Sequence, residues 1–138
     1  TPIISFIFRH TRAIPIAPAK EDPAMMDQAF AEVKKALDEG ELVGIFPEGR
    51  ITDTGELYPF RPGVSRILES NPVPVIPLAL QGLWGSFFSR KDGPAMSKPF
   101  RRGLFSKIAV VGAAPVPAEA ASPEHLQEIV AALRGEWR

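Results

Sequence analysis

The sequence predicts an α/β fold in which a mostly parallel β-sheet is flanked by helices. Apolar, strand-like segments alternate with helix-like segments along the 138 residues, and 15 prolines and 11 glycines separate them. A hydrophobic content of 45% suffices for one compact core but not comfortably for two. We therefore expect residues 1–138 to form a single domain. The sheet should be mainly parallel, because strand–helix–strand units favour right-handed crossovers.

Local capping signals predict three helices. Asp22 is suited to cap a helix that starts at Pro23, and apolar residues recur at helical spacing as far as Gly40, a stop signal. Ser122 and Pro123 begin a final helix in the same manner. A shorter helix is expected over residues 63–70.

Apolar runs between these helices predict the strands. Residues 42–46 are continuously apolar, which is typical of a parallel strand buried on both faces. Shorter strands are expected at residues 3–8 and 13–16, and later ones at residues 73–80 and 107–111. Pro77 interrupts the fourth of these runs and favours a sheet edge, a bulge or a strand end there.

Composition excludes several classes of function. Sixteen Lys and Arg balance sixteen Asp and Glu, so the chain lacks the cationic field that nucleic-acid binding requires. The absence of cysteine removes disulfides, thiolate metal sites and a cysteine nucleophile. There is no GxxxxGK phosphate loop, and no apolar run approaches the roughly 20 residues that span a bilayer. We expect no metal, no cofactor and no nucleic-acid partner.

The most informative segment follows the run at residues 42–46. Pro-Glu-Gly-Arg at residues 47–50 leaves the carboxyl end of an expected strand, where open α/β sheets bind ligands. Proline ends the strand, glycine lets the backbone approach a ligand, and arginine offers a fork suited to phosphate. Arg61 and Arg66 would add positive charge. From the residues alone, a phosphate site and a turn-stabilising Glu48–Arg50 ion pair both stay open.

Ordered motifs resemble one enzyme family. Residues 46–52, FPEGRIT, resemble the FPEG block of the lysophosphatidate and glycerol-phosphate (PlsC-like) acyltransferases. Residues 73–79 resemble the proline-containing strand that forms the fourth block of that family, and residues 57–63 are similar to its basic residue and glycine entering a helix. FPEG alone is a short motif, but the ordered pair of blocks, at the family's spacing, is a specific signal.

The resemblance implies a PlsC-like acyltransferase fold and an enzyme of phospholipid metabolism. Such enzymes transfer a fatty acyl group from acyl-CoA or acyl carrier protein to a hydroxyl of a lysophospholipid or glycerol phosphate. The motif positions imply that residues 48–50 bind the acceptor's glycerophosphate with help from Arg61, above a floor that includes residues 75–80. The substrate-binding residues implied in this way are Phe46, Pro47, Glu48, Gly49, Arg50, Thr52, Arg61, Gly63, Val75 and Pro77.

The family's catalytic HxxxxD motif has no match in this sequence. Five places after His10 stands Pro15, and five places after His125 stands Val130, so we assign no catalytic residue and expect both histidines to be structural or solvated. We expect the motif to lie upstream of Thr1, which makes this chain a truncated acyltransferase domain that is inactive alone.

The family's second block also differs here. It usually ends in an arginine that contacts the acceptor phosphate, whereas Pro18 follows the apolar residues 13–17. The difference weakens the case for plain glycerol 3-phosphate as the acceptor. The FPEGRIT spelling is more similar to acyltransferase modules fused to synthetases or transporters, which reacylate lysophospholipids.

Aromatic and basic residues are mixed across residues 84–107, with Asp92 as the one opposing charge. This mixture suits docking on an anionic bilayer, and we expect the whole protein to be membrane-associated on the cytoplasmic side. It equally suits binding of an acidic acyl carrier protein or of the phosphates of coenzyme A. A further alternative is a surface loop whose aromatic rings fold back onto the core. The alternative function is a non-catalytic module that binds phosphate or a lipid headgroup.

Overall fold

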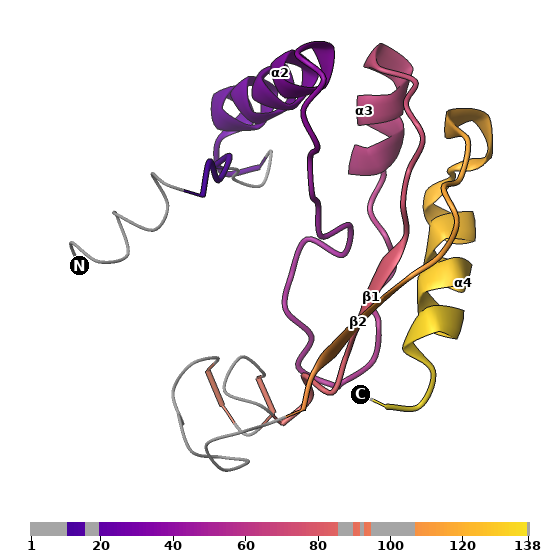
Figure 1. The fold of residues 1–138 in the computed structure, drawn as a ribbon. Coiled ribbons are helices and arrows are strands. Elements are labelled where there is room, and N and C mark those ends of the chain that lie inside the picture. Colours follow the sequence, from indigo (N-terminus) through magenta and orange to yellow (C-terminus); the bar gives the residue numbers. More distant parts are fainter. Residues whose placement is uncertain (1–10, 16–19, 86–89, 92, 95–106, 138) are drawn as a thin grey trace. The chain divides into compact units, whose positions relative to one another are not determined.

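The computed structural model describes residues 11–15, 20–85, 90–91, 93–94 and 107–137 (Figure 1). The chain divides into two compact units, Thr1–Gly44 and Ile45–Arg138, and each is described by itself. The expected strand at residues 3–8, His10, Pro18 and most of the aromatic and basic stretch at residues 84–107 lie outside the described residues. The expectation of a single domain stays a prediction.

Helix α2, Pro23–Asp38, dominates the first unit and confirms both of its predicted end signals. The Asp22 side chain accepts a hydrogen bond from the Met25 backbone N–H at 2.9 Å, a cap of the kind that stabilises helices by about 1 kcal/mol. At the other end Gly40 has a φ of +78°, and the N–H groups of Gly40 and Glu41 bond back to the carbonyls of Leu37 and Ala36. This is a Schellman motif, whose left-handed residue favours glycine.

The second unit contains two more helices, a 3-10 turn and a two-stranded sheet. These elements are α3 (Gly63–Ser70), β1 (Leu78–Gln81), β2 (Ala109–Gly112), the 3-10 turn Ala118–Ala120 and α4 (Pro123–Arg134). The strands pair antiparallel, with Leu78 opposite Gly112 and Gln81 opposite Ala109. A bridge between Val75 and Val116 continues the pairing beyond the strands. The helices at 63–70 and after Ser122 are as the sequence predicts.

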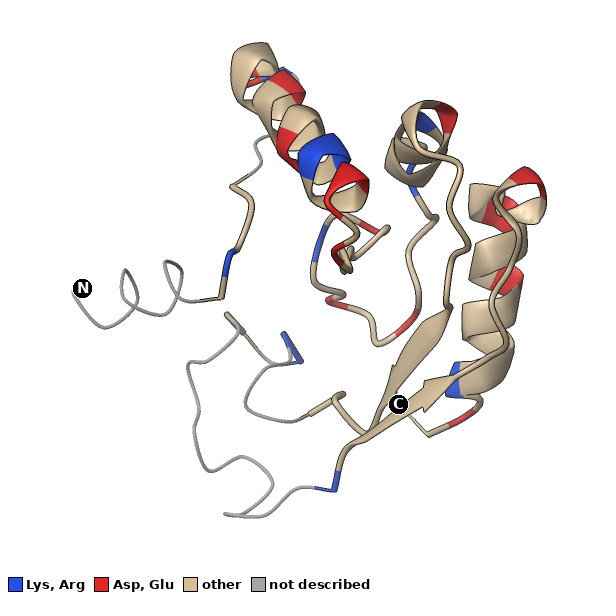
Figure 2. Ribbon diagram, turned by 45° about the horizontal axis from the view of Figure 1, so that its top comes forward, with Lys and Arg blue, Asp and Glu red and all other residues tan. Residues whose placement is uncertain are grey.

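Helix α4 lies along the sheet and closes the core of this unit (Figure 1). The buried core cluster consists of Val64 of α3, Leu126 of α4, and Val116 and Ala121 from the segment between β2 and α4. Ala79 of β1 is only 2% exposed. The charged residues lie on the helices and loops, whereas β1 and β2 carry none, as the colouring of Figure 2 makes clear. The sheet is therefore apolar, and α4 packs on it with Leu126 buried in the core.

Two expectations about the sheet need correction. The α/β class is confirmed, but the predicted mainly parallel sheet is not, because the two described strands run antiparallel. The strand expected at 73–80 begins at Leu78, since Pro74 and Pro77 have no N–H to donate to a ladder.

The predicted buried strand at residues 42–46 is wrong. This segment forms no strand, and Leu42 and Phe46 are 96% and 79% exposed. An apolar run becomes a strand only when a partner edge satisfies its backbone groups, and no described segment pairs with this one.

Among the residues that the structure describes, no helix has the length and apolar character to cross a membrane.

Candidate functional site

The loop formed by residues 46–61, called the 46–61 loop below, is closed by its own backbone. The Gly49 N–H donates to the Phe46 carbonyl at 3.0 Å, and the Arg61 N–H donates to the Pro47 carbonyl at 2.8 Å. Gly49 has a φ of +67°, and a Cβ at this position would lie 3.1 Å from both Cδ and Nε of Arg61. The Arg61 side chain therefore lies directly against the glycine turn that precedes Arg50.

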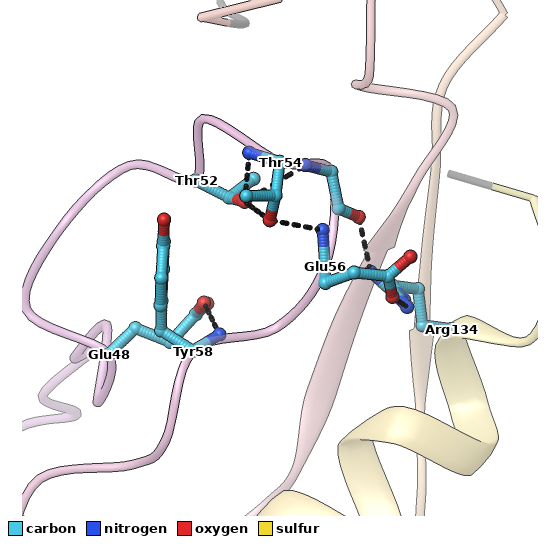
Figure 3. A network of polar contacts seen from close by, with 7 residues as sticks. Glu48, Thr52, Thr54, Glu56, Tyr58 and Arg134 are labelled. Atoms are coloured by element: carbon cyan, nitrogen blue, oxygen red, sulfur yellow. Dashed lines mark hydrogen bonds and ion pairs between the residues drawn. The ribbon is translucent and has the colours of Figure 1, made fainter.

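Glu48 organises the loop from inside. Its Oε2 accepts a hydrogen bond from the Tyr58 backbone N–H at 2.7 Å, and the side chain is half-buried (Figure 3). The contact joins the two sides of the loop across ten positions of the chain. A carboxylate that accepts a backbone N–H makes a charge-assisted hydrogen bond, which is stronger than a neutral one.

Arg50 pairs with Asp53 instead of Glu48. Its Nη2 lies 3.3 Å from Oδ2 of Asp53, and its guanidinium lies 4.2 Å from the centre of the Tyr58 ring. The turn-stabilising pair left open by the sequence thus exists with a different carboxylate. The Arg50 and Asp53 side chains are 45% and 43% exposed, so their ion pair is weak and easily exchanged.

The Tyr58 hydroxyl completes this cluster by donating to Oδ1 of Asp53. The hydrogen bond from Tyr58 lowers the pKa of Asp53, and the nearby Arg50 guanidinium lowers it further. The same hydrogen bond to Asp53 raises the pKa of Tyr58. Asp53 is therefore ionised, and Tyr58 neutral, throughout the neutral pH range.

The middle of the loop is a compact polar turn. Oγ1 of Thr52 accepts from the N–H groups of Gly55 at 3.1 Å and Thr54 at 3.3 Å, and Oγ1 of Thr54 accepts from the Glu56 N–H at 3.2 Å. Gly55 is buried with a φ of +83°, and a Cβ there would lie 2.8 Å from the Trp84 indole. The indole thus packs directly on the backbone of this turn.

Helix α4 contacts the loop at two places. Nη1 of Arg134 donates to the Gly55 carbonyl at 2.8 Å and Nη2 lies 3.0 Å from Oε2 of Glu56, as Figure 3 shows. Seven residues earlier on the helix, Oε1 of Gln127 accepts from the Phe60 N–H at 3.0 Å. Both contacts join parts of the chain more than sixty residues apart.

Comparison of the sequence with known proteins identifies a family. Residues 1–81 match the Acyltransferase family. The chain belongs to this family. Over 48 residues, 35% of this chain, it is 46% identical to the 1-acyl-sn-glycerol-3-phosphate acyltransferase of Bacillus subtilis (strain 168). The matched segment spans 23% of that relative's length, and no solved structure matches the chain. The predicted PlsC-like acyltransferase membership is confirmed.

The structure of this family member brings most of the predicted substrate-binding residues together. Phe46, Pro47, Glu48, Gly49, Arg50, Thr52 and Arg61 all lie on the 46–61 loop, and Gly63 opens α3 directly after it. Val75 and Pro77 instead belong to the sheet: Val75 exchanges two hydrogen bonds with Val116, and the Pro77 carbonyl accepts from the Ala113 N–H. The binding role of all these residues stays a prediction.

Sequence reasoning missed four residues of this candidate site: Asp53, Tyr58, Gln127 and Arg134. An acid three positions after Arg50 is a local signal that could have indicated Asp53. Nothing local indicates Gln127 or Arg134, because both reach the loop from α4. Trp84 was grouped with the aromatic and basic stretch, and in the structure it packs on Gly55.

The described part of the chain offers no set of three His, Cys, Asp or Glu side chains that could hold a metal ion. His125 lies exposed in the first turn of α4, where its backbone N–H donates to Oγ of Ser122. The prediction that His125 is solvated agrees with this position, whereas His10 is outside the described residues.

Proposed function

We propose that the protein containing this chain transfers a fatty acyl group to a hydroxyl of a lysophospholipid or glycerol phosphate, and that the 46–61 loop binds the phosphate of that acceptor. The acyl donor in this proposal is acyl-CoA or acyl carrier protein. The proposal is supported by family membership and by a relative named for acylation of 1-acylglycerol phosphate.

The observation that carries the proposal is the position of the two arginines. Arg61 lies against Gly49, and Arg50 follows that glycine in the chain, so one glycine turn carries one arginine against it and another next to it in sequence. Both residues are exposed. Guanidinium forks are suited to phosphate, and Gly49 lets the backbone approach an oxyanion closely.

Glu48 has a supporting role in this proposal. Its Oε2 is engaged by the Tyr58 N–H, so the side chain fixes the width of the loop between the two arginines. Removal of this acceptor leaves a half-buried backbone N–H without its partner, which costs about 1–3 kcal/mol. We therefore expect Glu48 to act on acceptor binding by holding the loop.

The remaining parts of the proposal concern the whole protein. We propose that an HxxxxD motif supplies the general base and that this chain alone is inactive, since Val130 stands where the pattern after His125 requires an acid. Membrane association through residues 84–107, on the cytoplasmic side, belongs to the same proposal. The alternative is a binding module without catalysis.

The test is acyl transfer from radiolabelled acyl-CoA and acyl carrier protein to a panel of lysophospholipids and glycerol 3-phosphate. The full-length gene product is assayed beside this chain. Arg50→Gln and Arg61→Gln should each raise the KM for the acceptor by about tenfold, the loss expected for one charge-assisted contact of about 1.4 kcal/mol. Glu48→Gln retains an acceptor oxygen, so it should raise the KM for the acceptor less than Glu48→Ala does.

Lys35→Gln on α2 is the control, since it removes one positive charge outside the loop. A full-length protein that binds the acceptors without transferring acyl groups would support the binding-module alternative. Equal KM values for Arg50→Gln and Lys35→Gln would contradict the proposal that the 46–61 loop binds the acceptor phosphate.

A further inference from the structure

We propose that Arg134, the last residue of α4, is a positioning residue that holds the 46–61 loop in the shape that binds the acceptor phosphate. This inference rests on the proposed function and extends it to a part of the chain outside the family match, which ends at residue 81. It assigns the C-terminal helix a role in the site besides its place in the core.

The first step is the geometry of the contact. The two terminal nitrogens of Arg134 engage adjacent residues of the loop, the Gly55 carbonyl at 2.8 Å and the Glu56 carboxylate at 3.0 Å. A planar guanidinium with two donors fixes both the distance and the orientation of what it binds, whereas a single ammonium fixes only a distance. Arg134 therefore specifies where this turn of the loop lies.

The second step is burial. The Arg134 side chain is only 16% exposed, and its Nε is buried with no hydrogen-bond partner among the described residues. Burial of an unpartnered N–H is unfavourable, so the two terminal contacts must offset that cost. An arginine used only for solubility would keep its head group in water.

The third step is what holds Arg134 itself. Nε2 of Gln81, at the end of β1, donates to the carbonyls of Leu133 at 2.9 Å and Arg134 at 3.1 Å. The backbone of Arg134 is thus attached to the sheet while its side chain reaches the loop. The path from β1 through α4 to Gly55 consists of direct hydrogen bonds.

The fourth step connects the turn to Arg50. Gly55 donates its N–H to Thr52, and the segment between Thr52 and Tyr58 presents Asp53 to Arg50 and to the Tyr58 hydroxyl. Arg134 touches neither Asp53 nor Tyr58 in these contacts. A change at Arg134 that alters the environment of Tyr58 therefore reports on the position of the loop.

The experiment compares Arg134→Gln, Arg134→Lys and the control Lys35→Gln in the 138-residue chain. Two readouts are taken: the dissociation constant for glycerol 3-phosphate from amide NMR shifts, and the alkaline titration of the chain's single tyrosine, Tyr58. Arg134→Gln should weaken binding about tenfold, because the binding-competent loop becomes a minor population. Arg134→Lys should fall between Gln and wild type.

The tyrosine titration separates positioning from simple loss of charge. Arg134→Gln should move the Tyr58 midpoint down towards that of free tyrosine, while Lys35→Gln leaves it unchanged. Unchanged binding and an unchanged Tyr58 midpoint in folded Arg134→Gln would overturn the inference.

If Arg134→Gln does not fold, Glu56→Ala carries the test, since it removes one of the two contacts at a half-exposed side chain. It should weaken binding about two- to threefold, as expected for a pair of this exposure, and shift Tyr58 in the same direction. No change in either readout would overturn the inference.

The proposed function can fail separately. If Arg50→Gln weakens binding about tenfold and the Arg134 variants do not alter it, only the positioning role fails. If the wild-type chain does not bind glycerol 3-phosphate, the proposed phosphate site fails, and the Tyr58 titration still decides whether Arg134 positions the loop.

Discussion

The two glycine turns of the 46–61 loop are held in different ways. The turn at Gly55 is buried between the Trp84 indole and the Arg134 guanidinium, both from distant parts of the sequence. The turn at Gly49 and Arg50 is exposed, and its contacts to Asp53, Tyr58 and Arg61 come from the loop itself. The turn at Gly55 is therefore fixed by distant parts of the chain, whereas the turn at Gly49 and Arg50 can exchange its contacts within the loop for contacts with a ligand.

Matched glycine substitutions give the largest expected effect and test this comparison directly. Gly55→Ala forces a left-handed φ of +83° on alanine and places its Cβ 2.8 Å from the indole of Trp84. The sum of backbone strain and overpacking should destabilise the chain by about 2–4 kcal/mol. The difference between the free energies of unfolding of Gly55→Ala and wild type, measured in urea, tests this expectation.

Gly49→Ala is the matched control for this prediction. Its φ of +67° imposes similar backbone strain, but the new Cβ meets only the flexible Arg61 side chain at 3.1 Å. The expected loss is about 1 kcal/mol, from the left-handed backbone alone. Equal losses for the two alanines would mean that the Gly55 turn is no more firmly held than the Gly49 turn.

A smaller effect concerns the pKa of Tyr58, which contacts Arg50 at the exposed turn. The hydrogen bond to Asp53 raises the pKa of Tyr58, so tyrosinate absorbance in the folded chain should appear at higher pH than in the denatured chain. Asp53→Asn should lower the Tyr58 midpoint towards the ordinary value of about 10. Coincident midpoints for wild type and Asp53→Asn would show that Tyr58 does not donate to Asp53 in solution.

The same contact has a defined pH window. Asp53 has a lowered pKa in the fold. Its contribution to the free energy of unfolding is therefore complete above the ordinary pKa of about 4 and is lost as pH falls through the lowered pKa. Tyr58 has a raised pKa in the fold. Its contribution to the free energy of unfolding is therefore complete below the ordinary pKa of about 10 and is lost as pH rises through the raised pKa. Between these limits the Tyr58–Asp53 contact should not depend on pH.

What the sequence predicts well here depends on local interactions. The capping residues Asp22 and Ser122 act on N–H groups three positions away, so both helix starts are legible in the sequence. Likewise, Pro47, Glu48, Gly49 and Arg50 form one short segment that closes a turn with its own backbone. The strand expected before this segment does not form, and its role as a ligand site stays a prediction.

What the sequence does not predict depends on distant partners. Residues 42–46 and 73–80 have similar apolar patterns, but only the second has a described strand partner, and only it contributes to a sheet. Strand pairing is not encoded in the run itself. Arg134 lies 78 positions from Glu56, and no periodicity or motif joins the two residues.

The central claim, that the 46–61 loop binds an acceptor phosphate through Arg50, is tested most directly by titrating glycerol 3-phosphate into the 138-residue chain and following the backbone amide resonances. The account predicts saturable shifts concentrated in residues 46–61, with a dissociation constant that Arg50→Gln raises by about tenfold and Lys35→Gln leaves unchanged. Shifts that are absent in wild type, or that saturate equally in Arg50→Gln, would contradict it.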